Sequence, residues 1–242
     1  MKRCVFVVLA AVAIILSGCS FLPVVTGSGT PRTAACSMKG FSGIQASQTF
    51  TVRVVPGPAW SVDVTCDDNL LPYIVVDTTQ NGTLRLGLEE GYIYQFITVS
   101  AEVHMPSLAM LDASGASEFD VGAGFVSARP LSISLSGAST ADVAGIVCGE
   151  LSVDASGASS ATVAGSVSME RVVASGASRA DLLNCVAASA DVTLSGASEA
   201  WVDTGSGVVS LSAGGASTLY YAGNPSFSFL DLSGTSRAVK VR

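Results

Sequence analysis

The sequence of 242 residues predicts an all-β protein, a parallel β-helix with turns of about 20 residues. Three observations predict this fold class. A Ser-Gly-Ala-Ser phrase recurs at a nearly fixed interval, apolar and polar residues alternate around each copy, and no helical period follows residue 18. We expect the strands that precede the repeats to continue into the same stack.

The central glycine of each phrase sets the period. The full phrase occurs five times, and the variants Gly-Gly-Ala-Ser and Ser-Gly-Thr-Ser follow it. The glycines are residues 115, 137, 157, 176, 196, 215 and 234, at steps of 19 to 22 residues. Such a repeat is too short for a propeller blade, and the leucine-rich pattern with its fixed Asn is absent. One turn of a parallel β-helix per repeat therefore fits best.

Alternation around each glycine predicts which side chains face the core. Residues at even offsets from the glycine are apolar or small, whereas odd offsets carry the charges. The row four residues before the glycine contains Leu111, Ile133, Val153, Val172, Val192, Leu211 and Leu230. The serine two residues after each glycine also faces inward, and we expect these hydroxyls to bond one another in a ladder. We expect the glycine at a bend without room for a side chain.

Shorter alternating segments before the repeats predict strands over residues 50–55, 60–65, 73–76, 84–88 and 96–105. Asn81-Gly82 predicts a hairpin turn between two of them. No helix is expected beyond the N-terminal segment.

Residues 1–18 have the pattern of an export signal. Lys2 and Arg3 precede a short apolar run that ends in Leu16-Ser17-Gly18-Cys19. This motif resembles the lipobox of bacterial lipoproteins, which implies cleavage before Cys19 and a lipid anchor on that residue. The alternative is an ordinary secretory signal that happens to contain a cysteine. Ser20 stands where a retention signal would have Asp, so the resemblance favours an outer-membrane or cell-surface location in the envelope.

The composition beyond the signal excludes some partners. Residues 19–38 combine Pro and Gly with Ser and Thr and are predicted to be a flexible tether before the domain at 39–242. Without Lys2 and Arg3, 10 basic residues face 19 acidic ones, a net charge of −9. Nucleic acid, which needs a basic face, is therefore not an expected partner.

Four cysteines fall in the predicted domain and tether. Cys36 and Cys66 flank the first strands and are candidates for a disulfide in an oxidising compartment. Cys148 and Cys185 are about two repeats apart, which places them roughly 10 Å apart in a stack and beyond the ~7 Å reach of a disulfide. We expect these two to be free, buried thiols.

Residues from about 40 onward resemble the putative auto-transporter adhesin, head GIN domain family. The resemblance rests on Gly40-Phe41-Ser42-Gly43-Ile44, on Met105-Pro106-Ser107-Leu108 before the first phrase, and on the repeated Ser-Gly-Ala-Ser. It implies a right-handed β-helix on exported, often lipid-anchored bacterial proteins. It implies no established reaction or ligand.

Candidate catalytic chemistry is sparse. No phosphate loop, HExxH sequence or metal-spaced Cys and His cluster occurs, and neither a catalytic residue nor a cofactor is predicted. Asp120 and Asp142 fall at equivalent positions of neighbouring repeats. They are either a solvated acidic edge, weak candidates for a cation site, or paired carboxylates. The one histidine, His104, is expected on the polar face of a strand.

Two aromatic residues are the main candidates for binding. Trp201 and Tyr220 both follow their glycine by five residues, so they should point outward side by side. Such a pair either carries a sugar ring, covers the edge of a turn, or contacts a partner subunit. The sequence therefore predicts a non-enzymatic, lipid-anchored envelope protein in adhesion, envelope structure or binding of a glycan, a partner protein or another copy. The alternative is a polysaccharide-active β-helix enzyme that uses surface Asp and Arg residues.

Overall fold

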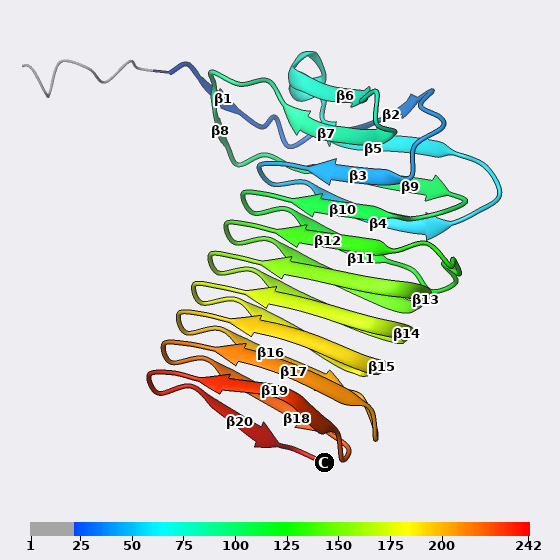
Figure 1. The fold of residues 1–242 in the computed structure, drawn as a ribbon. Helices are drawn as coiled ribbons and strands as arrows, with labels where there is room; N and C mark the ends of the chain where they lie inside the picture. Colours follow the sequence, from blue (N-terminus) through cyan, green and yellow to red (C-terminus); the bar gives the residue numbers. More distant parts are fainter. Residues whose placement is uncertain (1–21) are drawn as a thin grey trace, which may run out of the picture.

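The structure, a computed structural model, describes residues 22–242 and is a parallel β-helix (Figure 1). The predicted signal and Cys19 lie outside the described residues. Two ladders of parallel strands run the length of the stack, one before and one after the glycine turns. The repeat and its alternation therefore predicted the architecture correctly.

The first ladder precedes the glycine turns. Its strands are β7 (Thr83–Leu88), β3 (Gly43–Ala46), β10 (Met110–Ala113), β12 (Leu131–Leu135), β13 (Thr140–Ala155), β14 (Ser160–Ala174), β15 (Arg179–Leu194), β17 (Val208–Ala213) and β19 (Ser226–Leu232). The three long strands bend around a corner and also belong to the second ladder. The pairing of β3 with β10 confirms that N-terminal strands continue into the stack.

The second ladder follows the glycine turns. Besides the long strands it contains β9 (Val99–Met105), β4 (Thr51–Pro56), β11 (Glu118–Val121), β16 (Glu199–Asp203), β18 (Thr218–Ala222) and β20 (Arg237–Lys240). All of these neighbours are parallel. Equivalent residues of successive repeats therefore lie directly above one another.

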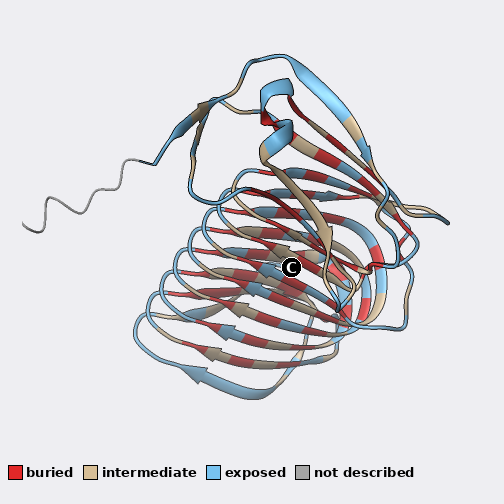
Figure 2. Ribbon diagram, turned by 90° about the horizontal axis from the view of Figure 1, so that it is seen from above, coloured by how far each residue is buried: buried red, intermediate tan, exposed pale blue. Residues whose placement is uncertain are grey.

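The core lies between the two ladders, as the even offsets predicted. Ile133 pairs with Val153, and Val153 with Val172, in one apolar row whose members are fully buried. Figure 2 shows buried and exposed residues alternating along each turn. The last turn departs from this pattern, because no described strand covers β19. Leu230 is 52% exposed there, although its partner Leu211 is fully buried.

The glycine of each phrase is required for two separate reasons. Gly157 has a φ of +75°, in the left-handed region that L side chains rarely adopt. A Cβ on Gly157 would lie 2.5 Å from the carbonyl oxygen of Gly137 in the preceding turn. The same approach recurs at every phrase, so only glycine allows the turns to stack this closely.

The inward serines bond differently from the expected ladder. Ser178 Oγ donates to Ser175 O within its own turn at 2.8 Å and to Ala155 O of the preceding turn at 2.9 Å. Ser139, Ser159 and Ser198 repeat this arrangement. The prediction of hydroxyl-to-hydroxyl bonds is wrong, because the bend brings carbonyl oxygens closer than the next serine. The buried hydroxyls are satisfied all the same.

Antiparallel strands cover the N-terminal end of the stack. The strands β2 (Pro31–Cys36) and β5 (Ser61–Asp67) extend the second ladder, and β6 (Ile74–Thr78) forms the predicted Asn81-Gly82 hairpin with β7. The 3-10 helix η1 (Asp68–Tyr73) links β5 to β6, so the expectation of no helix is wrong for these six residues. We call β2, β5, η1 and β6 the cap.

The flexible tether predicted for residues 19–38 is wrong over most of its described length. β1 (Val24–Thr26) pairs with β8 (Ile93–Gln95) in a separate two-stranded ribbon, and β2 pairs with β5. Asp67 holds the link between β1 and β2, because its buried carboxylate accepts hydrogen bonds from the N–H groups of Gly29 and Thr98. Composition alone indicated a tether because these contacts come from residues distant in the chain.

Candidate functional site

Trp201 and Tyr220 are register partners on neighbouring turns. Their rings stack with centroids 4.6 Å apart and planes 14° apart. The guanidinium of Arg179 lies 3.7 Å from the centroid of the Trp201 ring and forms an ion pair with Asp181 at 3.1 Å. We call Arg179, Trp201 and Tyr220 the aromatic column.

The column changes how these rings can bind. Arg179 covers one face of Trp201 and Tyr220 covers the other, so a sugar cannot stack on that indole as it would on a free platform. Tyr220 is followed in register by Val239, and both aromatic residues are half-buried. The column therefore offers ring edges, a phenol hydroxyl and a guanidinium to a ligand. The prediction found the two rings, whereas Arg179 was missed because its offset from the glycine is three, not five.

Asp120 and Asp142 are also register partners, and both are exposed. On its other side Asp120 lies opposite Arg53, which supplies a compensating positive charge on the same edge. Across residues 22–242, no group of three or more His, Cys, Asp and Glu residues is arranged to hold a metal ion. The arrangement matches a solvated edge of mixed charge. His104 lies on the same sheet, half-buried, with Nε2 3.0 Å from Glu102 Oε1.

The candidate disulfide between Cys36 and Cys66 is not formed. In the antiparallel pairing of β2 and β5, Cys36 lies opposite Val62 and Cys66 lies opposite Arg32. The two thiols are four residues apart along the ladder, and both are free. Burial raises the pKa of each thiol, with nearby aspartates adding to the effect. The predicted disulfide was wrong because two cysteines on paired strands can bond only when the register places them opposite each other.

Cys148 and Cys185 are free thiols on turns two apart, as the repeat spacing predicted. Cys185 is fully buried, but Cys148 is only half-buried and donates to Glu150 O at 3.3 Å. The expectation of burial is therefore met for one of the two.

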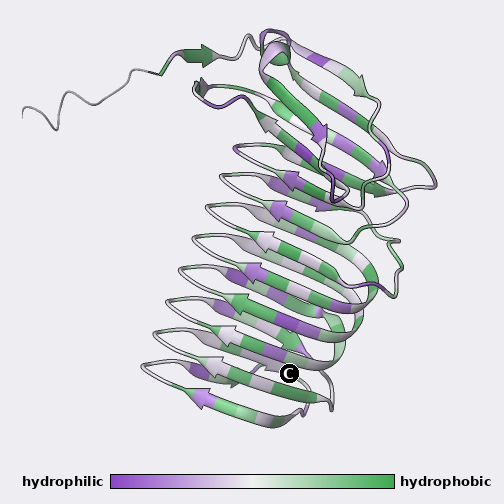
Figure 3. Cartoon of the chain, turned by 45° about the horizontal axis from the view of Figure 1, so that its top comes forward, coloured by the Kyte–Doolittle hydropathy of each residue, from purple (hydrophilic) through white to green (hydrophobic). Residues whose placement is uncertain are grey.

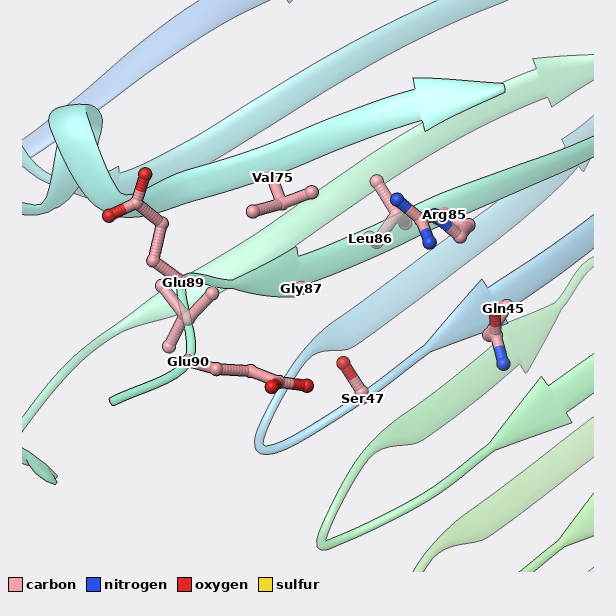
Figure 4. A pocket seen from close by; sticks show the side chains of 9 residues that line it. Gln45, Ser47, Val75, Arg85, Leu86, Gly87, Glu89 and Glu90 are labelled. Atoms are coloured by element: carbon pink, nitrogen blue, oxygen red, sulfur yellow. The ribbon is translucent and has the colours of Figure 1, made fainter. Parts of the chain in front are cut away.

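A groove near the cap was not predicted. It has a volume of about 480 Å³ and is lined by Gln45, Ser47, Val75, Arg85, Leu86, Gly87, Leu88, Glu89 and Glu90. Figure 4 shows the two glutamates at one end, Arg85 and Gln45 at the other, and Ser47 between them. Arg85 is held by an ion pair with Asp77, and its hydrogen bond lowers the pKa of that carboxyl. These groups can bond a polar ligand, but no nucleophile is paired with a base among them.

Glu170 is an ionisable group inside the core. Its side chain is fully buried, and neither carboxylate oxygen has a hydrogen-bond partner. Its register partners are Leu151 and Ala190. Burial raises the pKa of Glu170 to about 8, while the nearby Cys185 thiol lowers it and the charge of Asp203 raises it further. Burial and Glu170 together raise the pKa of the Cys185 thiol as well.

The sequence contained a signal for this residue. Six positions before the glycine, an even and therefore inward offset, stand Leu131, Leu151, Glu170, Ala190 and Val209. Extending the alignment by one more inward position identifies a carboxylate in an otherwise apolar row. It is a core group rather than part of a surface site.

The fold and its surface define a repeat protein of the β-solenoid class, with polar and aromatic side chains displayed on regular outer faces. The chain matches the model of the putative auto-transporter adhesin, head GIN domain family over residues 40–225 and belongs to that family. Family membership indicates an adhesin-type protein of the cell surface or envelope. A comparison with curated proteins finds no match. Within residues 22–242, no helix is long and apolar enough to cross a bilayer.

Solved structures share the fold at low sequence identity. A putative adhesin from Bacteroides fragilis NCTC 9343 has a TM-score of 0.78 and 18% identity, over 89% of this chain and 97% of its own. A putative lipid binding protein from Parabacteroides distasonis ATCC 8503 has a TM-score of 0.71 and 19% identity, over 90% and 100%. A putative adhesin from Parabacteroides merdae ATCC 43184 has a TM-score of 0.61 and 16% identity, over 91% and 100%. These likenesses establish the shared fold.

Proposed function

We propose that the protein is a lipid-anchored, non-enzymatic component of the bacterial cell envelope that acts in adhesion by binding a glycan or a partner protein. The Leu16-Ser17-Gly18-Cys19 motif supports the anchor, and the family's adhesin character supports the role in adhesion. The anchor would place the protein on the outer membrane or cell surface. A second copy of the chain is a further possible partner.

The aromatic column is the observation that supports binding most directly. It lies on the outer face of turns near the C-terminal end of the stack, whereas the chain enters at the opposite end (Figure 1). Stacked turns advance about 4.8 Å each, so seven phrases extend over roughly 30 Å. A protein held at its N-terminal end would therefore present the column away from the membrane to which it is attached.

The binding role is tested with an array of glycans and a panel of acidic polysaccharides, with turnover assayed in parallel. We expect saturable binding without release of oligosaccharides, and at least tenfold weaker binding by Trp201→Ala, since truncating an anchoring aromatic costs about 2 kcal/mol or more. Tyr92→Ala, which removes another half-buried tyrosine far from the column, is the matched control and should bind normally.

The same panel separates the alternatives. Reproducible cleavage would replace the binding role with the polysaccharide-active enzyme. Glycan binding that Trp201→Ala leaves intact would assign the ligand to another surface. If no glycan binds, the partner is a protein, and photo-crosslinking from position 220 in living cells should capture it.

A further inference from the structure

We propose that the ribbon of β1 and β8, together with Phe96, rests on the surface of the lipid bilayer and fixes how the stack stands on the membrane. This inference rests on the proposed lipid anchor at Cys19. It adds a second, non-covalent membrane contact made by the folded domain itself.

The outer face of the ribbon is apolar and uncovered. Val24 and Ile93 are register partners, and they are 55% and 43% exposed. Leu22, two residues before Val24, is also apolar and is 44% exposed. Figure 3 shows β1 as a hydrophobic strand that projects from the end of the stack. Contiguous exposed apolar side chains of this kind mark a surface that another apolar phase covers.

Phe96, directly after β8, adds a further exposed apolar side chain at a conformational cost. Strand alternation would turn Phe96 inward beside Tyr94, whose ring packs against Tyr73 and Tyr92. Instead Phe96 has a φ of +52°, rare for a bulky residue, and its side chain is 89% exposed. Gly27 packs against this bend, and a larger residue would not fit there, because its Cβ would clash with the carbonyl oxygen of Phe96. A strained backbone that exposes a phenylalanine indicates a role for that side chain outside the domain.

The length of the chain makes the bilayer the occupant of this face. Five residue steps separate Cys19 from Val24, and a fully extended chain covers at most about 3.6 Å per step. The ribbon therefore lies within about 18 Å of an acylated Cys19. An interfacial apolar face enters the headgroup and acyl boundary by roughly 5–10 Å, so the tethered ribbon reaches that depth without stretching.

Charge at the edge of the ribbon indicates which lipids it meets. Glu89 and Glu90 are exposed just before β8. Asp68 is exposed near the end of β1, where its carboxylate accepts a hydrogen bond from the Ser28 hydroxyl. Such an acidic rim is repelled by anionic lipids. The contact is therefore apolar, formed with zwitterionic lipid, and depends on the covalent anchor to hold the domain nearby.

The test uses the full mature chain with its lipid, reconstituted in phosphatidylcholine vesicles whose acyl chains carry bromine. Phe96→Trp should gain emission that is blue-shifted and quenched by the brominated chains. Val126→Trp is the matched control, because Val126 is an apolar residue with 74% exposure that pairs with Val147 of the stack instead of lying on the ribbon. Its emission should be unquenched. Phe96→Ser with Ile93→Ser should leave the fold and the acylation intact but remove membrane protection of residues 92–97 from hydrogen exchange.

The outcomes separate this inference from the proposed anchor. An acylated, vesicle-bound chain in which Phe96→Trp is no more quenched than Val126→Trp would overturn the inference and leave the anchor standing. Shielding of Phe96→Trp from aqueous quenchers in native envelopes, without quenching in vesicles, would assign the face to a protein and also overturn it. A mature chain without acyl chains would instead refute the anchor.

Discussion

Gly157→Ala should destabilise the protein by about 3 kcal/mol or more, although it adds a single methyl group. The left-handed backbone, with φ at +75°, costs an alanine roughly 1–2 kcal/mol. The larger part of the loss comes from the Cβ, 2.5 Å from the Gly137 carbonyl oxygen, because two turns must separate to admit it. Urea denaturation followed by circular dichroism measures the effect.

Gly40→Ala is the control that isolates the contact between turns. Gly40 has a φ of +76°, nearly the same as Gly157, but nothing lies within 4 Å of a Cβ built there. We expect only the same backbone cost, roughly 1–2 kcal/mol. Equal losses of stability in the two variants would show that the close contact between successive glycine turns adds nothing to the backbone cost.

Glu170 should make the stability of the protein fall as the pH rises from about 5 to 8. Burial raises the pKa of Glu170 from 4.5 to about 8 in the folded state. Between those values the folded protein keeps a proton that the unfolded chain releases, so the free energy of unfolding falls by up to about 1.4 kcal/mol per pH unit. The contribution is complete below the unfolded pKa and lost above the folded pKa.

Glu170→Gln should flatten this dependence, since an amide of the same shape does not titrate. The variant should resemble the wild type near pH 5 and exceed its stability by several kcal/mol at pH 8 and above. Glu170→Met, which also removes the unpartnered polar atoms, controls for burial of the amide. Subtracting each variant's curve from that of the wild type removes the titration of every other group. Parallel curves would show that Glu170 finds water or a partner in solution.

The sequence predicted the repeating part of the fold in detail because the repeat itself encodes the register. Once the glycines are aligned, the inward row at Ile133, the pairing of Trp201 with Tyr220 and that of Asp120 with Asp142 all follow from alternation. Each residue's neighbours in the stack are its counterparts one period away.

Outside the repeat the same reasoning failed, because contacts there do not follow a period. The N-terminal segment looked like a tether, yet Asp67 and β5 hold it in place. Cys36 and Cys66 looked close, yet an antiparallel register separates them. Arg179 packs on Trp201, although it stands three residues after its glycine and Trp201 stands five after its own, so the repeat alignment does not make them neighbours. The carbonyl partners of the serines likewise depend on the three-dimensional shape of the bend.

The intact mass of the mature protein, extracted from the membranes of the bacterium that produces it, tests the central claim most directly. The proposed anchor predicts a chain that begins at Cys19 and carries a thioether-linked diacylglycerol. Cys19→Ser should abolish this mass shift and leave the protein as an unprocessed precursor or a soluble form. A mature chain that begins elsewhere, or a Cys19 without lipid, would contradict the assignment of this β-helix to the lipid-anchored proteins of the envelope.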